Sequence, residues 1–194
     1  MDNYDQAKSH LEGLRKKFKK TEETFQKYNA VIQSYISEGH AEPVPVSELQ
    51  TTEGKRHFLF HHGVRHPRKN KLRVVFNASK KIDGKSVNDQ IMNCPDKLER
   101  LVGIINRFIE HAIAVTADIV AFFHNVRIPK EDQDFGRFLW YEDGKVDGQV
   151  VQFCLLKHLF GGIVSQCCAV MALTDCISKH VPLKLTEDQC RDLI

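Results

Sequence analysis

Apolar residues recur every three or four positions near the start of the chain, which is the period of an amphipathic helix. The pattern predicts a first helix over residues 4–19 and a second helix that begins after Thr21. Gly39 is well placed to end the second helix, and the prolines that follow prevent its continuation. The apolar faces comprise Tyr4, Ala7, Leu11, Leu14 and Phe18 in the first helix and Phe25, Tyr28, Val31, Ile32, Tyr35 and Ile36 in the second.

After Arg56 the period shortens to that of strands. HFLFHHGV and KLRVVFNAS predict two strands joined by the basic segment RHPRKN, and Asp83-Gly84 then marks a turn. A helical pattern follows from Leu98 to Phe108, and HAIAVTADI (111–119) predicts a short buried strand. A β-hairpin is predicted for the segment RFLWYEDGKVDGQVVQFCLL. A helix that begins after two glycines is predicted for FGGIVSQCCAVMALTDCISKH. This order of elements indicates an α+β fold.

The composition is that of an ordinary globular protein, with 42% hydrophobic and 27% charged residues among 194. The net charge of +3 does not by itself indicate a nucleic-acid partner, but five of the cations are clustered in one short segment. A cluster of cations is a footprint for polyanions, and a solvated basic hairpin is the competing interpretation. The cluster consists of Arg65, Arg68, Lys69, Lys71 and Arg73.

Six cysteines are present without a Cys-x-x-Cys pair, so the sequence predicts no zinc site and reduced thiols. The first ten residues are polar, which does not fit a secretory signal peptide, and no apolar run approaches the length of a membrane span. We therefore expect an intracellular protein, cytoplasmic or nuclear, without a membrane partner.

Asp118 stands at the end of the predicted strand 111–119, directly before two phenylalanines. A carboxylate at the mouth of a buried strand must be paired, hydrated or bound to a metal. Mg²⁺ sites for phosphoryl transfer use such carboxylates, whereas a helix cap is the simpler interpretation. Lys71 and Arg73 alternate along a strand, so both point to one face, where they could hold a triphosphate or lie exposed to solvent.

Several motifs occur together and in order: GHAEPVP, HHGV-x-HP, LRVVFNAS, S-x-N-D, TADI, FH-x-VRIP-x-ED-x-DF-x-RFLW and HLFGG. From about residue 5 to about residue 180 the chain resembles the reverse transcriptase of Pao/BEL-type LTR retrotransposon Pol polyproteins. The resemblance implies an RNA-directed DNA polymerase fold of the right-hand type, comprising fingers and part of the palm. It divides the chain into an N-terminal helical segment (1–45), fingers and partial palm (46–180) and a divergent tail (181–194).

The resemblance also implies roles for particular residues. Asp118 matches the first catalytic aspartate, with the backbone carbonyl of Ile119 as a second Mg²⁺ ligand. Phe123 matches the aromatic residue under the incoming sugar, which selects deoxynucleotides. The implied dNTP-binding residues are Lys71, Arg73, Phe122, Phe123, Phe160 and Gly161, and the implied nucleic-acid-binding residues are Arg65, Arg68 and Lys69. The implied partners are an RNA or DNA template-primer, dNTPs and the remainder of the Pol polyprotein.

The chain departs from this family at three points. No Asp-Asp pair occurs in it, so the family's Tyr-x-Asp-Asp hairpin is missing; Asn77 replaces an Asp, and Gln166 replaces a Pro. One carboxylate cannot hold two Mg²⁺ ions in catalytic geometry, so we expect no nucleotidyl transfer by this chain alone, which leaves its standing as an enzyme open. Two alternatives stay open: a co-opted, non-catalytic nucleic-acid-binding module, and an internal piece of a larger product that supplies the missing carboxylates.

Overall fold

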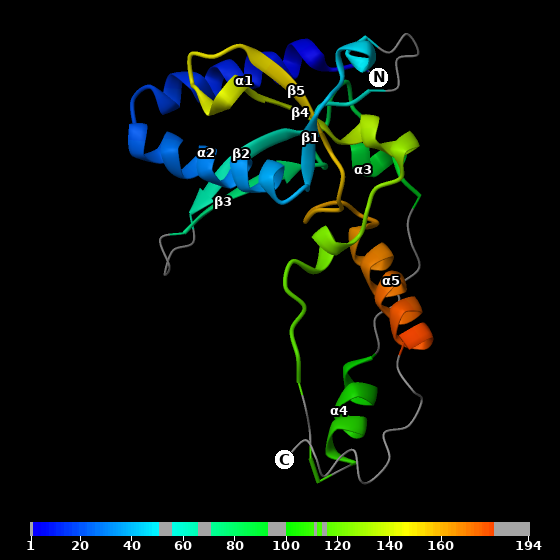
Figure 1. Cartoon of the computed structure of the whole chain (residues 1–194). Coiled ribbons are helices and arrows are strands. Elements are labelled where there is room, and N and C mark those ends of the chain that lie inside the picture. Colours follow the sequence, from blue (N-terminus) through cyan, green and yellow to red (C-terminus); the bar gives the residue numbers. More distant parts are fainter. Residues whose placement is uncertain are drawn as a thin grey trace.

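Two long helices open the chain and lie side by side across the strands (Figure 1). In this computed structural model the described residues are 2–50, 56–65, 71–92, 100–110, 112–113 and 116–180. Helices α1 (Tyr4–Phe18) and α2 (Glu22–Ser37) confirm the two predicted amphipathic patterns, because their buried positions are the predicted apolar ones. Gly39 follows α2 with a φ of +68°, which fits the predicted end of the helix.

The strands form two small antiparallel sheets. The predicted basic hairpin is present as β2 (Phe60–Arg65) and β3 (Leu72–Asn77), and the second predicted hairpin as β4 (Arg137–Tyr141) and β5 (Val150–Leu155). A short strand that the sequence pattern did not reveal, β1 (Ala41–Pro43), adds to β5 and gives the order β1-β5-β4. The chain is therefore mixed α/β with small antiparallel sheets.

A β-bridge joins the segment before β2 to β4 at a place that we call the seam. Phe58 forms a parallel bridge with Arg137: the Leu59 amide donates to the Arg137 carbonyl (2.7 Å), and the Arg137 amide donates to the His57 carbonyl (3.2 Å). The buried Asn3 side chain bonds both backbone groups of Phe58, at 2.9 and 2.7 Å. The seam thus unites the N-terminus, the basic hairpin and β4 in one core.

The core between α1, α2 and the strands is rich in aromatic rings. Trp140 stacks on Tyr28 with ring centroids 5.2 Å apart, and His61 lies against both rings. His61 is buried and makes two hydrogen bonds: its Nδ1 with the Tyr28 hydroxyl (2.6 Å) and its Nε2 with the Leu139 carbonyl (3.0 Å). Because a carbonyl only accepts, Nε2 carries the proton, and neutral Nδ1 accepts from the hydroxyl.

The remaining helices lie towards the other end of the molecule. The short α3 (Val87–Gln90) follows β3, and α4 (Leu101–Ile109) and α5 (Ser165–His180) extend away from the sheets (Figure 1). Four 3₁₀ segments connect the elements: η1 (Val46–Glu48), η2 (Phe122–Asn125), η3 (Lys130–Gly136) and η4 (Glu142–Gly144). No described helix is long and apolar enough to cross a membrane.

Candidate nucleotide and nucleic-acid interface

The segment that carries Asp118 is not a strand. Residues 116–120 are exposed and lie outside both sheets, so the prediction of a buried strand over 111–119 is wrong for this part of it. A strand needs a hydrogen-bonding neighbour, and no described strand runs beside this segment. Asp118 is therefore an exposed carboxylate, not one held at the end of a sheet, and the Ile119 side chain is 41% exposed.

Three of the residues predicted for nucleotide binding do come together. Ala121 takes a positive φ (+53°) and turns the chain into η2, where the Phe122 and Phe123 ring centroids lie 5.6 Å apart. Phe123 meets Phe160 edge-to-face, with centroids 4.5 Å apart and planes at 87°. Phe160 is 73% exposed, so this aromatic contact forms a surface platform and not a core cluster.

Asn88 holds the turn that carries Phe160 and Gly161 in place. Its Nδ2 donates to Ser79 Oγ (2.9 Å) and to the Gly161 carbonyl (2.9 Å), and its Oδ1 accepts from the Ile163 amide (3.1 Å). One side chain thus ties the end of β3 to the turn before α5. Asn88 belongs to the S-x-N-D motif, from which no role for it was predicted.

Asn88 is itself positioned by a capping box at the start of α3. Ser86 Oγ accepts from the Asp89 amide (3.2 Å), and Asp89 Oδ2 accepts from the Ser86 amide (3.0 Å). The hydrogen bonds from Ser86 lower the pKa of the Asp89 carboxyl. A Ser-x-x-Asp spacing is a known start signal for helices, so the sequence contained a usable clue to this turn.

The basic hairpin presents its cations on two faces. Lys71, directly before β3, and Arg73, within it, are both exposed, and Arg73 lies opposite Val64 in the register. Arg65 points to the other face, where its guanidinium donates to Thr24 Oγ1 of α2 (3.0 Å). The predicted cations Arg68 and Lys69 lie outside the described residues.

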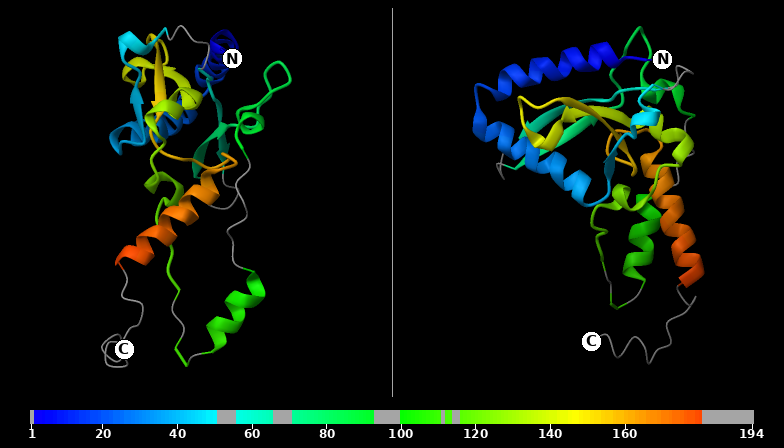
Figure 2. Two further views of the ribbon diagram at one scale, coloured as in Figure 1. Left: turned by 90° about the vertical axis from the view of Figure 1, so that its right-hand side faces the viewer. Right: turned by 45° about the horizontal axis from the view of Figure 1, so that its top comes forward.

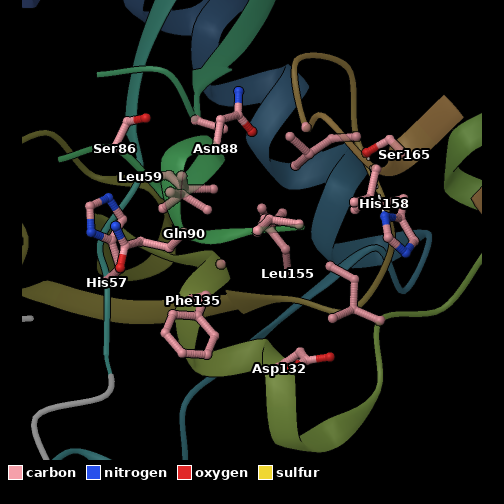
Figure 3. Close-up of a pocket in the computed structure, with 18 of the residues that line it drawn as sticks. His57, Leu59, Ser86, Asn88, Gln90, Asp132, Phe135, Leu155, His158 and Ser165 are labelled. Carbon is pink, nitrogen blue, oxygen red and sulfur yellow. Dashed lines mark hydrogen bonds between the residues drawn. The ribbon is translucent and has the colours of Figure 1, made fainter. Parts of the chain in front are cut away.

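A cavity of about 600 Å³ lies behind the Gly161 turn. Figure 3 shows His57 and Phe135 on one side of it and His158 and Ser165 on the other. Burial lowers the pKa of both imidazoles, and His158 Nδ1 lies 3.4 Å from Ser165 Oγ. Asp132 is the one Asp, Glu, Lys or Arg among the described lining residues, so the cavity suits a neutral, largely apolar group and not a triphosphate.

Two further predictions concern metals and thiols. No group of three or more His, Cys, Asp or Glu that could hold a metal occurs among the residues that the structure describes. Cys167 is disulfide-bonded, so the prediction of reduced thiols is wrong at that position, whereas Cys154, Cys168 and Cys176 are not in disulfides.

Comparison of the chain with known protein families finds no family that matches it. Comparison with curated proteins finds no match either. The resemblance to retrotransposon reverse transcriptases, which depends on the motifs of the sequence, therefore stays a prediction.

Proposed function

We propose that this chain is a reverse-transcriptase-derived fingers and partial palm unit that binds a template-primer and a dNTP but does not transfer nucleotides by itself. The observation that carries the proposal is the contact between Phe123 and Phe160. These residues belong to two separate motifs of the resemblance, and both motifs concern the nucleotide pocket. Their rings meet edge-to-face on the surface, where a base or sugar could pack against them.

The hairpin supports the proposal from a second direction. Lys71 and Arg73 are both exposed on the hairpin, and the described residues contain no carboxylate in an ion pair with either of them. Two cations that no acid neutralises attract phosphate, and the planar guanidinium of Arg73 can bind phosphate oxygens in a bidentate manner. Their role in this proposal is to hold the triphosphate or the polynucleotide backbone.

The described residues do not complete a magnesium site. Asp118 is an exposed carboxylate in a segment without strand neighbours, and the Ile119 carbonyl is the one further ligand that the resemblance assigns nearby. Mg²⁺ bound between substrate phosphates and one or two carboxylates supplies charge neutralisation in phosphoryl transfer, but two-metal chemistry needs more acidic ligands than this. We therefore assign binding and positioning to this chain and no chemical step.

The test is a primer-extension assay on a poly(rA)/oligo(dT) duplex with Mg²⁺, beside equilibrium binding of the same duplex over a salt series. We expect no incorporation, and binding that weakens about tenfold in Lys71→Ala/Arg73→Ala, which corresponds to about 1.4 kcal/mol. The matched control is Lys80→Ala/Lys81→Ala, which removes two exposed cations beyond the hairpin.

Two results would contradict the proposal. Equal binding by the hairpin variant and the control variant would remove the basic hairpin from the interface. Incorporation that disappears in Asp118→Ala would show that the chain is a complete polymerase, and that the assignment of binding without chemistry is wrong.

A further inference from the structure

Positive charge is concentrated in the last turn of α1 and in the two residues after it, and only part of this charge is neutralised by described ion pairs. Five of the six residues from Arg15 to Lys20 are Lys or Arg. Arg15 pairs with Glu12 (2.9 Å), donates to the Gly148 carbonyl (3.2 Å) and lies over the Tyr141 ring. Lys19 pairs with Asp147 (2.5 Å). These two cations therefore have structural partners.

The other three cations, Lys16, Lys17 and Lys20, have no ion-pair partner among the described residues. All three are exposed, and no described carboxylate lies within ion-pair distance of them. Lys16 and Lys17 lie in the last turn of α1, where cations are favourable, and Lys20 follows the helix. Their charge exceeds what the ion pairs of the described residues neutralise at this end of α1, so it is available to an anionic ligand.

This lysine triplet lies at the same end of the molecule as the basic hairpin, as both Figure 1 and the right-hand view of Figure 2 show. The hydrogen bond from Arg65 to Thr24 Oγ1 ties the hairpin to the first turn of α2, four residues after Lys20. Arg73 lies on the opposite face of the hairpin from Arg65 and so points away from α2, whereas the lysine triplet lies just before the start of α2. A polynucleotide backbone that passes around this end of the molecule could contact both groups.

We propose that Lys16, Lys17 and Lys20 form a second contact for a nucleic-acid backbone, outside the fingers hairpin. The inference rests on the proposed function in so far as both require a bound polynucleotide. Nucleic acid fits better than a lipid surface, because a membrane-binding helix exposes an apolar face, and the apolar residues of α1 are buried. Those residues are Ala7, Leu11, Leu14 and Phe18.

The experiment measures binding of a fluorescent DNA duplex and of an RNA–DNA hybrid by anisotropy, at a series of KCl concentrations. Each phosphate contact contributes about 0.9 to the slope of log K against log salt concentration. The variant Lys16→Gln/Lys17→Gln/Lys20→Gln should therefore flatten the slope by about 2 to 3 and weaken binding at least tenfold at low salt. The charge-preserving variant with Arg at all three positions should retain the wild-type slope.

The matched control is Lys80→Gln/Lys81→Gln/Lys85→Gln, which removes three exposed lysines elsewhere. If the lysine-triplet variant loses no more than this control while Lys71→Ala/Arg73→Ala binds weakly, the inference fails and the proposed function stands. If the triplet variant alone binds weakly, the inference stands and the hairpin part of the proposed function fails. Wild-type protein that binds neither duplex, or that prefers phosphatidylserine vesicles to both, overturns the inference. Circular dichroism of each variant confirms that it is folded.

Discussion

Acidification should destabilise the fold through His61, whose imidazole is buried in the aromatic core. Burial lowers the pKa of His61 from 6.5 to about 4, with lesser effects from nearby histidines, while its bond to the Leu139 carbonyl acts in the opposite direction. The folded state therefore holds this imidazole neutral over a pH range in which the unfolded chain protonates it. Stability from this group is complete above pH 6.5 and is lost as the pH falls towards 4.

The size of the effect follows from the shift. A pKa lowered from 6.5 to about 4, at about 1.4 kcal/mol per unit, corresponds to about 3–4 kcal/mol, a sizeable part of the stability of an ordinary domain. Burial lowers the pKa of His40, His57 and His158 as well, so the slope of stability against pH sums several groups. A variant that removes His61 alone is needed to isolate its share.

Urea unfolding at several pH values between 7 and 4 measures this share. His61→Gln removes the titration and keeps a polar side chain, so its stability should fall less steeply with acid than that of the wild type. Tyr28→Phe keeps the titration and leaves Nδ1 without its 2.6 Å partner, which should cost about 1–3 kcal/mol at neutral pH. Parallel curves for the wild type and His61→Gln would refute the reasoning.

Three further substitutions test other parts of the fold. Asn88→Ala removes three hydrogen bonds at a partly exposed site and should cost about 1–3 kcal/mol, while speeding amide exchange at Ile163 measured by NMR. Arg137→Met removes a fully buried guanidinium bonded to Asp134 at 2.6 Å and should cost about 2–4 kcal/mol in urea unfolding, because its bonds to charged and polar partners are lost. Gly144→Ala places a methyl group 2.5 Å from the Asn29 amide at a φ of +66°, so its melting temperature should fall by several degrees, whereas Gly13→Ala, in open space on α1, should not lower it.

The sequence predicted the parts of the fold that depend on local patterns. In the two helices and both hairpins, the alternation of apolar and polar residues extends over enough positions to identify the element. Asp83-Gly84 is a tight turn, as predicted, and both residues have positive φ. Strand β1 was not predicted, because three residues are too few to show a strand-like alternation. Its pairing with β5 depends on a contact between residues far apart in the chain. The alternation around Asp118 resembled a strand, but a strand also needs a neighbour, which a local pattern cannot supply.

The candidate site was predictable to a smaller degree. The motifs named Phe123 and Phe160, whose rings are in contact, and Lys71 and Arg73, which are both exposed. The part played by Asn88 depends on Gly161 and Ile163, which lie 73 and 75 residues further along the chain, so no local spacing could reveal it. The exposure of Asp118 likewise depends on which strands surround it.

The seam at Phe58 has a consequence for the order of folding. Both hairpins form from residues close in sequence, whereas the Asn3–Phe58 bonds span 55 residues and the Phe58–Arg137 bridge joins the segment before one hairpin to the first strand of the other. Closing such distant contacts loses more chain entropy than closing a hairpin, so it occurs late. During synthesis the basic hairpin therefore cannot complete the seam until β4 has left the ribosome. Until then the Leu59 amide and side chain are exposed and can form non-native contacts.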